Sequence, residues 1–315
     1  MSKIQADCPI CHSNSSEYHS IIAPWITELA NLPLTPSKYF SCNNCSYSWF
    51  SRFSDNLVHS LYSKYRSESY YAVRHSWEPW FSKNDNKAFD ETSSIKASNS
   101  VSGRKRDIEA IFDLSGLSLK QINGCLDFGG DSGQFIPNDI KGVKYVVDQQ
   151  IASSYNVDSI TYVSDIEVIE KKSLGLIMCC MVLEHVNDVN ETIRDLVKLL
   201  SINGFLYIEV PMDSFRVSKF HQTWFYEKYL NFLSDHGYLF QLLDFATGVW
   251  RLSFKSIPFW GVLKQSEHIN YFNYPTIQAL LEKFGFISIC KIENPKSRQG
   301  KLRFGKIQLL GEFRN

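Results

Sequence analysis

Four cysteines near the start of the chain occur in two pairs with the spacing of metal ligands. Cys8 and Cys11 form the motif CPIC, and Cys42 and Cys45 form CNNC. A gap of two residues lets both thiolates of a pair reach one metal ion, and two such pairs complete the tetrahedral site that Zn²⁺ prefers. Because a site with four thiolates is coordinatively closed, we expect a zinc ion that stabilises the fold and takes no part in chemistry.

The thirty residues between the two pairs exceed the usual spacing of a zinc ribbon, so the intervening chain must make an excursion. The alternative to a zinc site is a set of unligated thiols, and His12 or His19 would replace a cysteine that is not a ligand. Four further cysteines lie in apolar runs and are expected in the core: Cys125, Cys179, Cys180 and Cys290.

A glycine-rich bend in the segment LDFGGDSGQF could hold a cofactor. A strand is expected to end at Asp127 and to run directly into Gly129, Gly130 and Gly133. Without side chains at these glycines, the backbone can turn sharply and a ligand can approach closely. The bend alone also fits a nicotinamide or flavin site, or a tight turn that binds nothing.

Two acidic residues follow the next expected strands. Asp148 ends the second strand of the unit about twenty residues after the bend, where a carboxylate can accept hydrogen bonds from ribose hydroxyls. Asp165, in YVSDIEV, would close the third strand beside an adenine. Together with the bend, these residues favour an adenosine-containing cofactor.

Apolar strands alternate with amphipathic helices from the bend onwards, and this rhythm predicts a mostly parallel sheet covered on both faces. A helical stripe from Val189 to Leu200 is expected to stop at Asn203–Gly204. The expected strands are 143–148, 174–181, 205–210, and those around 286–292 and 306–313, with a further helix at 275–284.

The pattern divides the chain into three parts. Residues 1–55 would form the zinc-binding module, 56–102 a helical connecting segment, and 103–315 the α/β domain. An aromatic-rich stretch at 212–265 interrupts the rhythm and is interpreted as an insertion over the carboxyl ends of the strands. Six of its aromatic side chains are expected either in the core or stacked on a sugar or nucleobase: Trp224, Phe225, Tyr226, Trp250, Phe259 and Trp260.

Composition restricts the partners. Lys and Arg number 33, as do Asp and Glu, so the chain has no excess of positive charge for a phosphate backbone, and nucleic acid is disfavoured. No apolar run has the length of a membrane span, and the N-terminus lacks the pattern of a signal peptide. We therefore expect a protein that stays in the cytoplasm.

Two longer segments carry a resemblance to a known family. MVLEHVNDVNETIRDLVKLLSINGFLYIEVP resembles the fourth strand, helix and fifth strand of class I S-adenosylmethionine-dependent methyltransferases. SEHINYFNYPTIQALLEKFGF resembles the segment that follows the fifth strand in the subgroup related to sugar methyltransferases. With the bend, these motifs extend over about 190 residues in the family's order.

The resemblance implies a Rossmann-like α/β core that binds S-adenosylmethionine. It assigns Asp127 and the three glycines to the cofactor loop, Asp148 to the ribose and Asp165 to the adenine. Asp131 stands where the family usually has glycine, and Asp tolerates the left-handed backbone of such a turn better than most residues.

The same resemblance implies the catalytic groups. His185 and His268 are the candidate bases, and Glu267 is a candidate acid or orienting group. The alternatives are that His185 only shapes the start of a helix and that His268 is a structural histidine. The deoxysugar C-methyltransferases carry a similar N-terminal zinc module, which agrees with the cysteine pairs.

These features predict O- or C-methylation of a sugar, either linked to a nucleotide or part of a surface polysaccharide. One alternative is an RNA base methyltransferase whose zinc module binds RNA. Another is a scaffold in which Asp131 has abolished cofactor binding.

Overall fold

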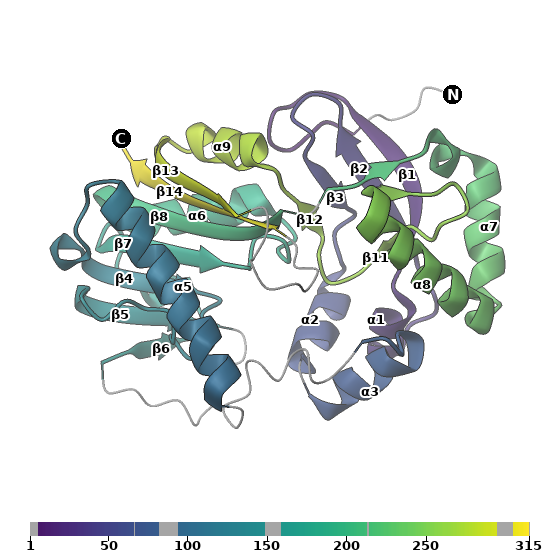
Figure 1. The fold of residues 1–315 in the computed structure, drawn as a ribbon, viewed down its shortest axis with the longest axis horizontal. Helices are drawn as coiled ribbons and strands as arrows, with labels where there is room; N and C mark the ends of the chain where they lie inside the picture. Colours follow the sequence, from purple (N-terminus) through teal and green to yellow (C-terminus); the bar gives the residue numbers. More distant parts are fainter. Residues whose placement is uncertain are drawn as a thin grey trace. The chain divides into compact units, whose positions relative to one another are not determined.

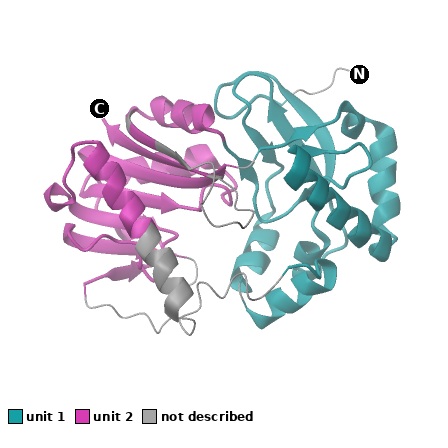
Figure 2. Ribbon diagram, viewed as in Figure 1, with its two compact units in different colours: residues 1–85, 213–272 teal, residues 86–212, 273–315 magenta. Residues whose placement is uncertain are grey.

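The computed structural model describes residues 6–65, 67–81, 94–148, 159–212, 214–294 and 305–314. The chain divides into two compact units, and each is made of two separate stretches of sequence (Figure 2). Unit 1 comprises Met1–Asp85 and Asp213–Phe272, whereas unit 2 comprises Asn86–Met212 and Asn273–Asn315. The stretch interpreted as an insertion therefore belongs to the same unit as the N-terminal cysteines.

Unit 2 contains a seven-stranded sheet in the order β13-β14-β8-β7-β4-β5-β6 (Figure 1). All neighbours from β8 to β6 pair in parallel, while β14 is antiparallel to both β8 and β13. The predicted mostly parallel α/β sheet is thereby confirmed. The strands are β4 (Asn123–Phe128), β5 (Lys141–Val147), β6 (Thr161–Val163), β7 (Leu174–Cys180), β8 (Leu200–Met212), β13 (Phe286–Asn294) and β14 (Gly305–Phe313).

The order of these strands reverses at β4. From β4 the chain passes outward through β5 and β6, and it then returns to the other side of β4 to form β7 and β8. In open parallel sheets, a ligand binds outside the carboxyl ends of the strands at such a reversal. The end of β4 and the adjoining end of β7 are therefore the place to look for a site.

Helices cover this sheet because their apolar residues fall on one face. In α6 (Val189–Leu199), the Asp188 side chain accepts a hydrogen bond from the Glu191 backbone N–H at 3.0 Å and caps the first turn. The buried residues of α6 recur at helical spacing: Val189, Ile193, Leu196 and Leu199. The other helices of unit 2 are α5 (Ser94–Leu114) and α9 (Tyr274–Lys283).

The predicted helix stop at Asn203–Gly204 is wrong. Helix α6 ends at Leu199, and Leu200 already begins β8 with extended backbone angles. Asn203 lies inside that strand with a φ of 62°, where the register against β7 shifts and the strand bulges. The left-handed residue therefore accommodates a bulge in the strand and does not end the helix.

Unit 1 contains a five-stranded sheet in the order β11-β1-β2-β3-β12. The two short strands at its edges come from the later stretch, so 213–272 and the N-terminal segment share one sheet. The strands are β1 (Ser15–Ile22), β2 (Pro36–Cys42), β3 (Ser48–Phe50), β11 (Lys264–Gln265) and β12 (Asn270–Tyr271), and β9 (Arg216–Val217) pairs separately with β10 (Ser256–Ile257). The helices are α1 (Pro24–Leu29), α2 (Asp55–Ser63), α3 (Glu68–Trp77), α7 (Trp224–Ser234) and α8 (Gly237–Phe254).

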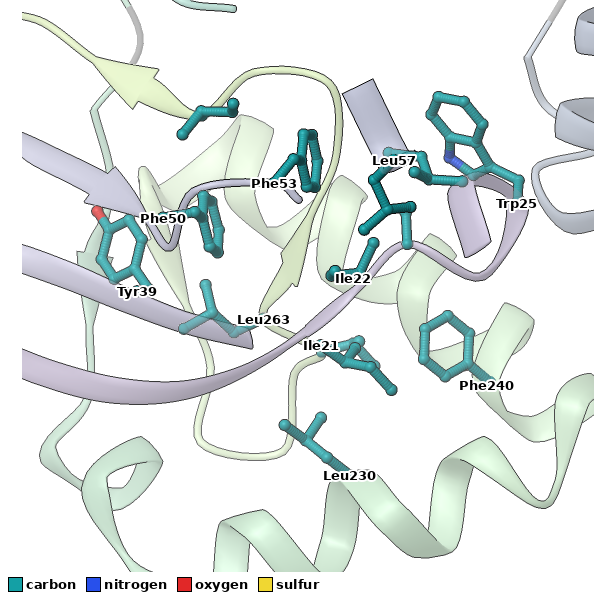
Figure 3. Packing of buried hydrophobic residues seen from close by; sticks show 14 of the residues in the cluster. Ile21, Ile22, Trp25, Tyr39, Phe50, Phe53, Leu57, Leu230, Phe240 and Leu263 are labelled. Carbon is teal, nitrogen blue, oxygen red and sulfur yellow. The ribbon is translucent and has the colours of Figure 1, made fainter. Parts of the chain in front are cut away.

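Both stretches of unit 1 contribute to one apolar core. Trp25 and Phe50 from the N-terminal stretch and Leu230 and Phe240 from α7 and α8 belong to the same cluster (Figure 3). The N-terminal segment therefore completes its core with helices from later in the chain. Of the aromatic residues singled out in the sequence, Tyr226 is fully buried in this core, and the half-buried Trp260 accepts a hydrogen bond from Tyr229 at its carbonyl.

Surface exposure distinguishes the remaining aromatics of that stretch. Trp224, Phe225 and Phe259 are more than half exposed, so they are not core residues, and Trp250 is also exposed. Within the described residues, no helix is both long enough and apolar enough to cross a bilayer.

We predict that Ile193→Ala destabilises unit 2 by about 2–5 kcal/mol, because it leaves a cavity beneath α6 where Ile193 is completely buried. The matched control is Ile202→Ala at a position that is 68% exposed, where the cost should stay below about 1 kcal/mol. Urea unfolding followed by circular dichroism measures both. Equal losses for the two variants would contradict the assigned core.

Candidate functional site

The glycine bend after β4 adopts left-handed backbone at alternate residues. Gly129 and Gly133 each have a φ of 69°, and Asp131 between them has a φ of 52°. The Gly129 N–H donates to the Val147 carbonyl at 2.7 Å, which ties the bend to β5. Asp131 thus occupies a position that suits glycine, and it holds the conformation expected of it from the sequence.

The glycines also leave space that side chains would fill. A Cβ at Gly130 would overlap the carboxyl group of Asp127, and a Cβ at Gly129 would overlap Val182 beyond the end of β7. A Cβ at Gly133 would lie 2.8 Å from Val146. The backbone of the bend therefore packs directly against the neighbouring strand ends. A loop without side chains at these positions also lets a ligand approach its backbone closely.

Asp127 is the most unusual group of the bend. Its side chain is 1% exposed, and among the described residues neither of its carboxyl oxygens has a hydrogen-bond partner. Burial, together with the nearby Asp148 and Asp131, raises its pKa to about 7, although Arg104 opposes this shift. A buried acid without a partner is costly for a fold, so the position is suited to a group that arrives from outside.

Asp148 and Asp165 both follow their strands at the same edge of the sheet. Asp148 comes directly after β5, and its Oδ2 accepts a hydrogen bond from the Asp131 N–H at 3.0 Å. This bond holds the left-handed turn of the bend. Asp165 follows β6 and caps a short 3-10 helix by accepting from the Glu167 N–H at 2.9 Å.

His185 lies beyond the carboxyl end of β7. Phe128 of β4 pairs with Cys179 of β7, so the two strands end side by side and bring the bend and the 181–185 segment to one edge. The His185 N–H donates to the Val182 carbonyl at 2.9 Å, and its Nε2 lies 3.9 Å from Oε1 of the buried Glu184. The ring is partly exposed, as a group that exchanges protons must be.

One group near the bend was not anticipated from the sequence. Arg104 of α5 pairs with Glu209 of β8 at 2.8 Å and lies over the Phe135 ring, 4.3 Å from its centroid. It is also the positive charge that partly opposes the rise in the pKa of Asp127. No local motif marks Arg104, because the residues that it meets are brought to it only by the sheet.

Glu267 belongs to unit 1, where it forms part of a buried ion-pair network. Its two carboxylate oxygens accept hydrogen bonds from the Tyr70 hydroxyl and from Arg74, each at 2.9 Å. Arg74 also binds Glu78 at 2.9 Å, and Glu78 accepts from Lys264 at 2.5 Å. Although burial alone raises the pKa of Glu78, Lys264 and Arg74 lower it below its usual value.

This network fixes the segment that precedes His268. Lys264 also binds Asp244 of α8, so helices α3 and α8 hold the segment through one chain of charges. Both carboxylate oxygens of Glu267 already accept hydrogen bonds from α3. The arrangement therefore suits the role of an orienting group better than that of an acid that donates a proton. The half-buried His268 follows it in unit 1, whereas His185 belongs to unit 2.

The four N-terminal cysteines form one cluster. The sulfur of Cys8 lies 3.7 Å from that of Cys45, and the sulfur of Cys11 lies 3.4 Å from that of Cys42. All four sulfurs lie within 4.8 Å of one another. Four thiolates bound tetrahedrally at about 2.3 Å from Zn²⁺ would lie roughly 3.8 Å apart, so the cluster has suitable dimensions for that ion.

The surrounding backbone explains how distant cysteines meet. Strands β1 and β2 pair antiparallel from Ser15 opposite Cys42, so the excursion between the two pairs is a hairpin that carries α1. The backbone N–H groups of Asn44 and Cys45 both point to the Cys42 sulfur at 3.4 Å. The hydrogen bond between the Cys8 and Cys45 thiols lowers the pKa of Cys8 and raises that of Cys45, so one thiol of this pair ionises more readily than the other.

Known structures resemble this chain only distantly. A 1,6-didemethyltoxoflavin-N1-methyltransferase from Burkholderia thailandensis, solved with S-adenosylhomocysteine, is 13% identical over 72% of this chain and 87% of its own, with a TM-score of 0.41. A putative S-adenosylmethionine-dependent methyltransferase from Listeria monocytogenes is also 13% identical, over 68% and 99%, with a TM-score of 0.43. No curated protein sequence matches the chain.

The comparison of the chain with known protein families identifies its family. The methyltransferase domain family matches residues 102–290, which is more than half of the chain and includes the bend, Asp148 and His185. The strand order and the glycine bend agree with that match. The chain therefore belongs to the methyltransferase domain family and is an S-adenosylmethionine-dependent methyltransferase with a Rossmann-like α/β core.

Proposed function

We propose that this enzyme methylates a sugar, either linked to a nucleotide or part of a surface polysaccharide, at oxygen or carbon. The observation that carries the placement of the cofactor is the buried carboxyl group of Asp127, which has no hydrogen-bond partner among the described residues. The support for a sugar is the SEHINYF segment, which resembles the sugar-methyltransferase subgroup.

The residues of the bend fit S-adenosylmethionine. The cofactor carries an ammonium, a carboxylate and two ribose hydroxyls, and bound here it would supply a methyl group already activated on sulfur. Asp127 would provide a negative charge for the ammonium, and the glycines would leave room for the cofactor. Asp148 would accept from the ribose, and Asp165 would lie at the adenine.

The protein must then orient the acceptor and remove its proton. In this proposal His185 accepts the proton at its Nε2 while Glu184 stabilises the positive ring that results. His268 is the second candidate base, and the ion pairs of Glu267 with α3 would hold the His268 segment in place. For a sugar hydroxyl, whose proton is weakly acidic, such a base lowers the barrier to attack on the methyl group.

The cysteine cluster would hold a structural zinc ion. Cys8, Cys11, Cys42 and Cys45 are the proposed ligands, and their four thiolates leave no coordination position for a substrate. The zinc would clamp the start of β1 to the turn after β2, and its binding free energy would add to the stability of unit 1.

We predict that Asp127→Asn and Gly130→Ala both weaken binding of S-adenosylmethionine by tenfold or more. The first variant removes the charge expected to meet the ammonium, which is worth about 1.5–3 kcal/mol. The second introduces a methyl group that overlaps Asp127. Asp113→Asn is the control, because it removes the charge of an exposed Asp near the end of α5, outside the bend. Titration calorimetry measures the three variants.

The same titrations should depend on pH. With a pKa of about 7, Asp127 is protonated in the free enzyme below that value, so affinity should rise as the pH increases from about 6 to 8. Asp127→Asn should lack this rise. Wild-type protein that shows no binding at any pH would rule against the placement of the cofactor in the bend and would support the scaffold alternative.

We predict that the purified protein contains about one zinc ion per chain, measured by plasma mass spectrometry. Cys8→Ser and Cys45→Ser should each abolish the zinc content and lower the unfolding midpoint, whereas Cys290→Ser, outside the cluster, should alter neither. Metal-free wild-type protein with the same unfolding midpoint in chelator would refute the zinc site.

We predict that nucleotide sugars accept label from methyl-labelled cofactor, with products resolved by mass and position. His185→Ala should lower kcat by about 10²–10⁴-fold without changing cofactor affinity, and His268→Ala should lower kcat in the same way. His59→Ala, an exposed histidine on α2, is the control. Cofactor binding without transfer to any sugar would defeat the substrate assignment, and unchanged turnover in both variants would remove the histidines as bases.

A further inference from the structure

His268 lies in a short link between the two edge strands of the unit 1 sheet. Strand β11 pairs with β1 at one edge of that sheet, and β12 pairs with β3 at the other (Figure 1). The four residues 266–269 join Gln265 of β11 to Asn270 of β12. So short a link has little freedom of its own. The contacts that fix Gln265 and Asn270 therefore also limit the movement of His268.

A buried amide holds the N-terminal end of this link. Gln265 is completely buried, its Oε1 accepts a hydrogen bond from the Ser37 hydroxyl, and its Nε2 donates to the Ser51 carbonyl at 2.7 Å. The Gln265 carbonyl accepts from the Ala23 N–H at 2.8 Å. Within the link, the carboxylate of Glu267 is bound by α3. The N-terminal end is thus fixed without any contribution from the cysteine cluster.

Tyr47 holds the C-terminal end of the link. Its hydroxyl donates to Oδ1 of Asn270 at 2.5 Å, and the two residues are 1% and 4% exposed. One residue earlier in the link, the Ile269 carbonyl accepts from the Phe50 N–H at 2.9 Å. A hydrogen bond between two buried groups is costly to lose, because a partner left behind is shielded from water. The bond therefore anchors the residue two positions after His268.

The turn that carries the second cysteine pair also sets the position of Tyr47. Tyr47 comes two residues after Cys45, and its carbonyl accepts from the Cys42 N–H at 2.8 Å, which closes the turn. The Tyr47 ring stacks on Trp49, with the ring centroids 5.1 Å apart, and its centroid lies 5.5 Å from that of Phe272. These contacts hold the ring in place. The hydroxyl therefore connects the cysteine cluster to the His268 link.

The backbone pairing of β12 is too short to fix this end by itself. Strand β12 consists of Asn270 and Tyr271, which lie opposite Trp49 and Ser48 of β3. A segment with so few backbone hydrogen bonds opens locally at a small cost in free energy. The buried side-chain bond from Tyr47 adds an anchor where the strand alone offers little.

We propose, on the basis of the proposed role of His268 as a base, that Tyr47 is a positioning residue for methyl transfer. Its hydrogen bond to Asn270 holds the link so that the His268 ring keeps one orientation. A base accelerates proton removal only when its ring nitrogen stays within hydrogen-bond reach of the acceptor, so a loosened link slows transfer. The turn of the cysteine cluster thereby supports the reaction as well as the fold.

The nuclear magnetic resonance signal of the His268 ring tests this positioning without any acceptor. With ¹³C-labelled histidine the chain gives eight ring signals, and the one that His268→Ala lacks belongs to His268. Tyr47→Phe keeps the aromatic ring and removes the hydroxyl, so it should shift and broaden this signal through exchange between conformations. An unchanged His268 signal in Tyr47→Phe overturns the proposal.

The matched control is Tyr229→Phe. It also removes a hydroxyl from unit 1, one that donates to the Trp260 carbonyl at 2.6 Å, away from the link. The His268 signal and kcat should both stay at their wild-type values in this variant. Loss of both in Tyr229→Phe would show a general response to a lost hydroxyl and would overturn the specific role of Tyr47.

Kinetics test whether the positioning matters for transfer. With a sugar that accepts the labelled methyl group, Tyr47→Phe should lower kcat about 10–100-fold. Cofactor affinity and zinc content should not change, because Tyr47 is a proposed ligand of neither. Asn270→Leu removes the other partner, so the double variant should lose no more than the larger single loss. Losses that multiply in the double variant overturn the proposal.

Failure of this proposal and failure of the proposed function give different results. If His268→Ala lowers kcat but Tyr47→Phe does not, the positioning role is overturned while the base remains. If His268→Ala keeps its kcat, the base itself is wrong and the role of Tyr47 in transfer fails with it. If no sugar is methylated, the His268 signal still decides whether Tyr47 places the ring. Circular dichroism checks folding, and Asn270→Leu supplies the same two measurements if Tyr47→Phe unfolds.

Discussion

The position of β4 between β5 and β7 is the constraint on which unit 2 depends. Because both neighbours pair with β4 in parallel, three strands end at one edge, and the bend must turn in the space between Val147 and Val182. Only glycine satisfies the steric limits at Gly129 and Gly130. The close packing that excludes side chains at these two glycines also buries Asp127, and burial raises the pKa of its carboxyl group. The unusual protonation behaviour of this acid is therefore a consequence of the fold.

Buried charge has a different role in each unit. In unit 2, Arg104 satisfies Glu209 and leaves Asp127 without a hydrogen-bond partner among the described residues. In unit 1, the charges around Arg74 and Lys264 are paired with carboxylates, and they join elements that are distant in sequence. A paired charge fixes geometry, because removing one partner leaves the other buried and uncompensated. An unpartnered acid is instead available to a ligand.

The cysteine cluster and the shared core both join parts of unit 1 that are distant in sequence. The N-terminal stretch supplies more than half of the buried residues of this core, among them Trp25, Phe50 and Leu61. Residues 213–272 supply the edge strands and helices that complete the core, and the four cysteines bring the ends of the β1–β2 hairpin together. A metal bound at that point would add its binding free energy to the stability of the folded unit.

The sequence by itself determined the parallel sheet, the glycine bend, the acidic strand ends and the cysteine pairs, because each depends on local periodicity or short spacing. It misplaced the end of α6, since a left-handed Asn203 suits a helix stop and a strand bulge equally well. Tertiary structure alone decided that residues 213–272 join the N-terminal segment, that Glu267 pairs with Arg74, and that Arg104 lies near Asp127. These contacts join residues that are distant in sequence, and no local pattern encodes which distant partner a side chain will meet.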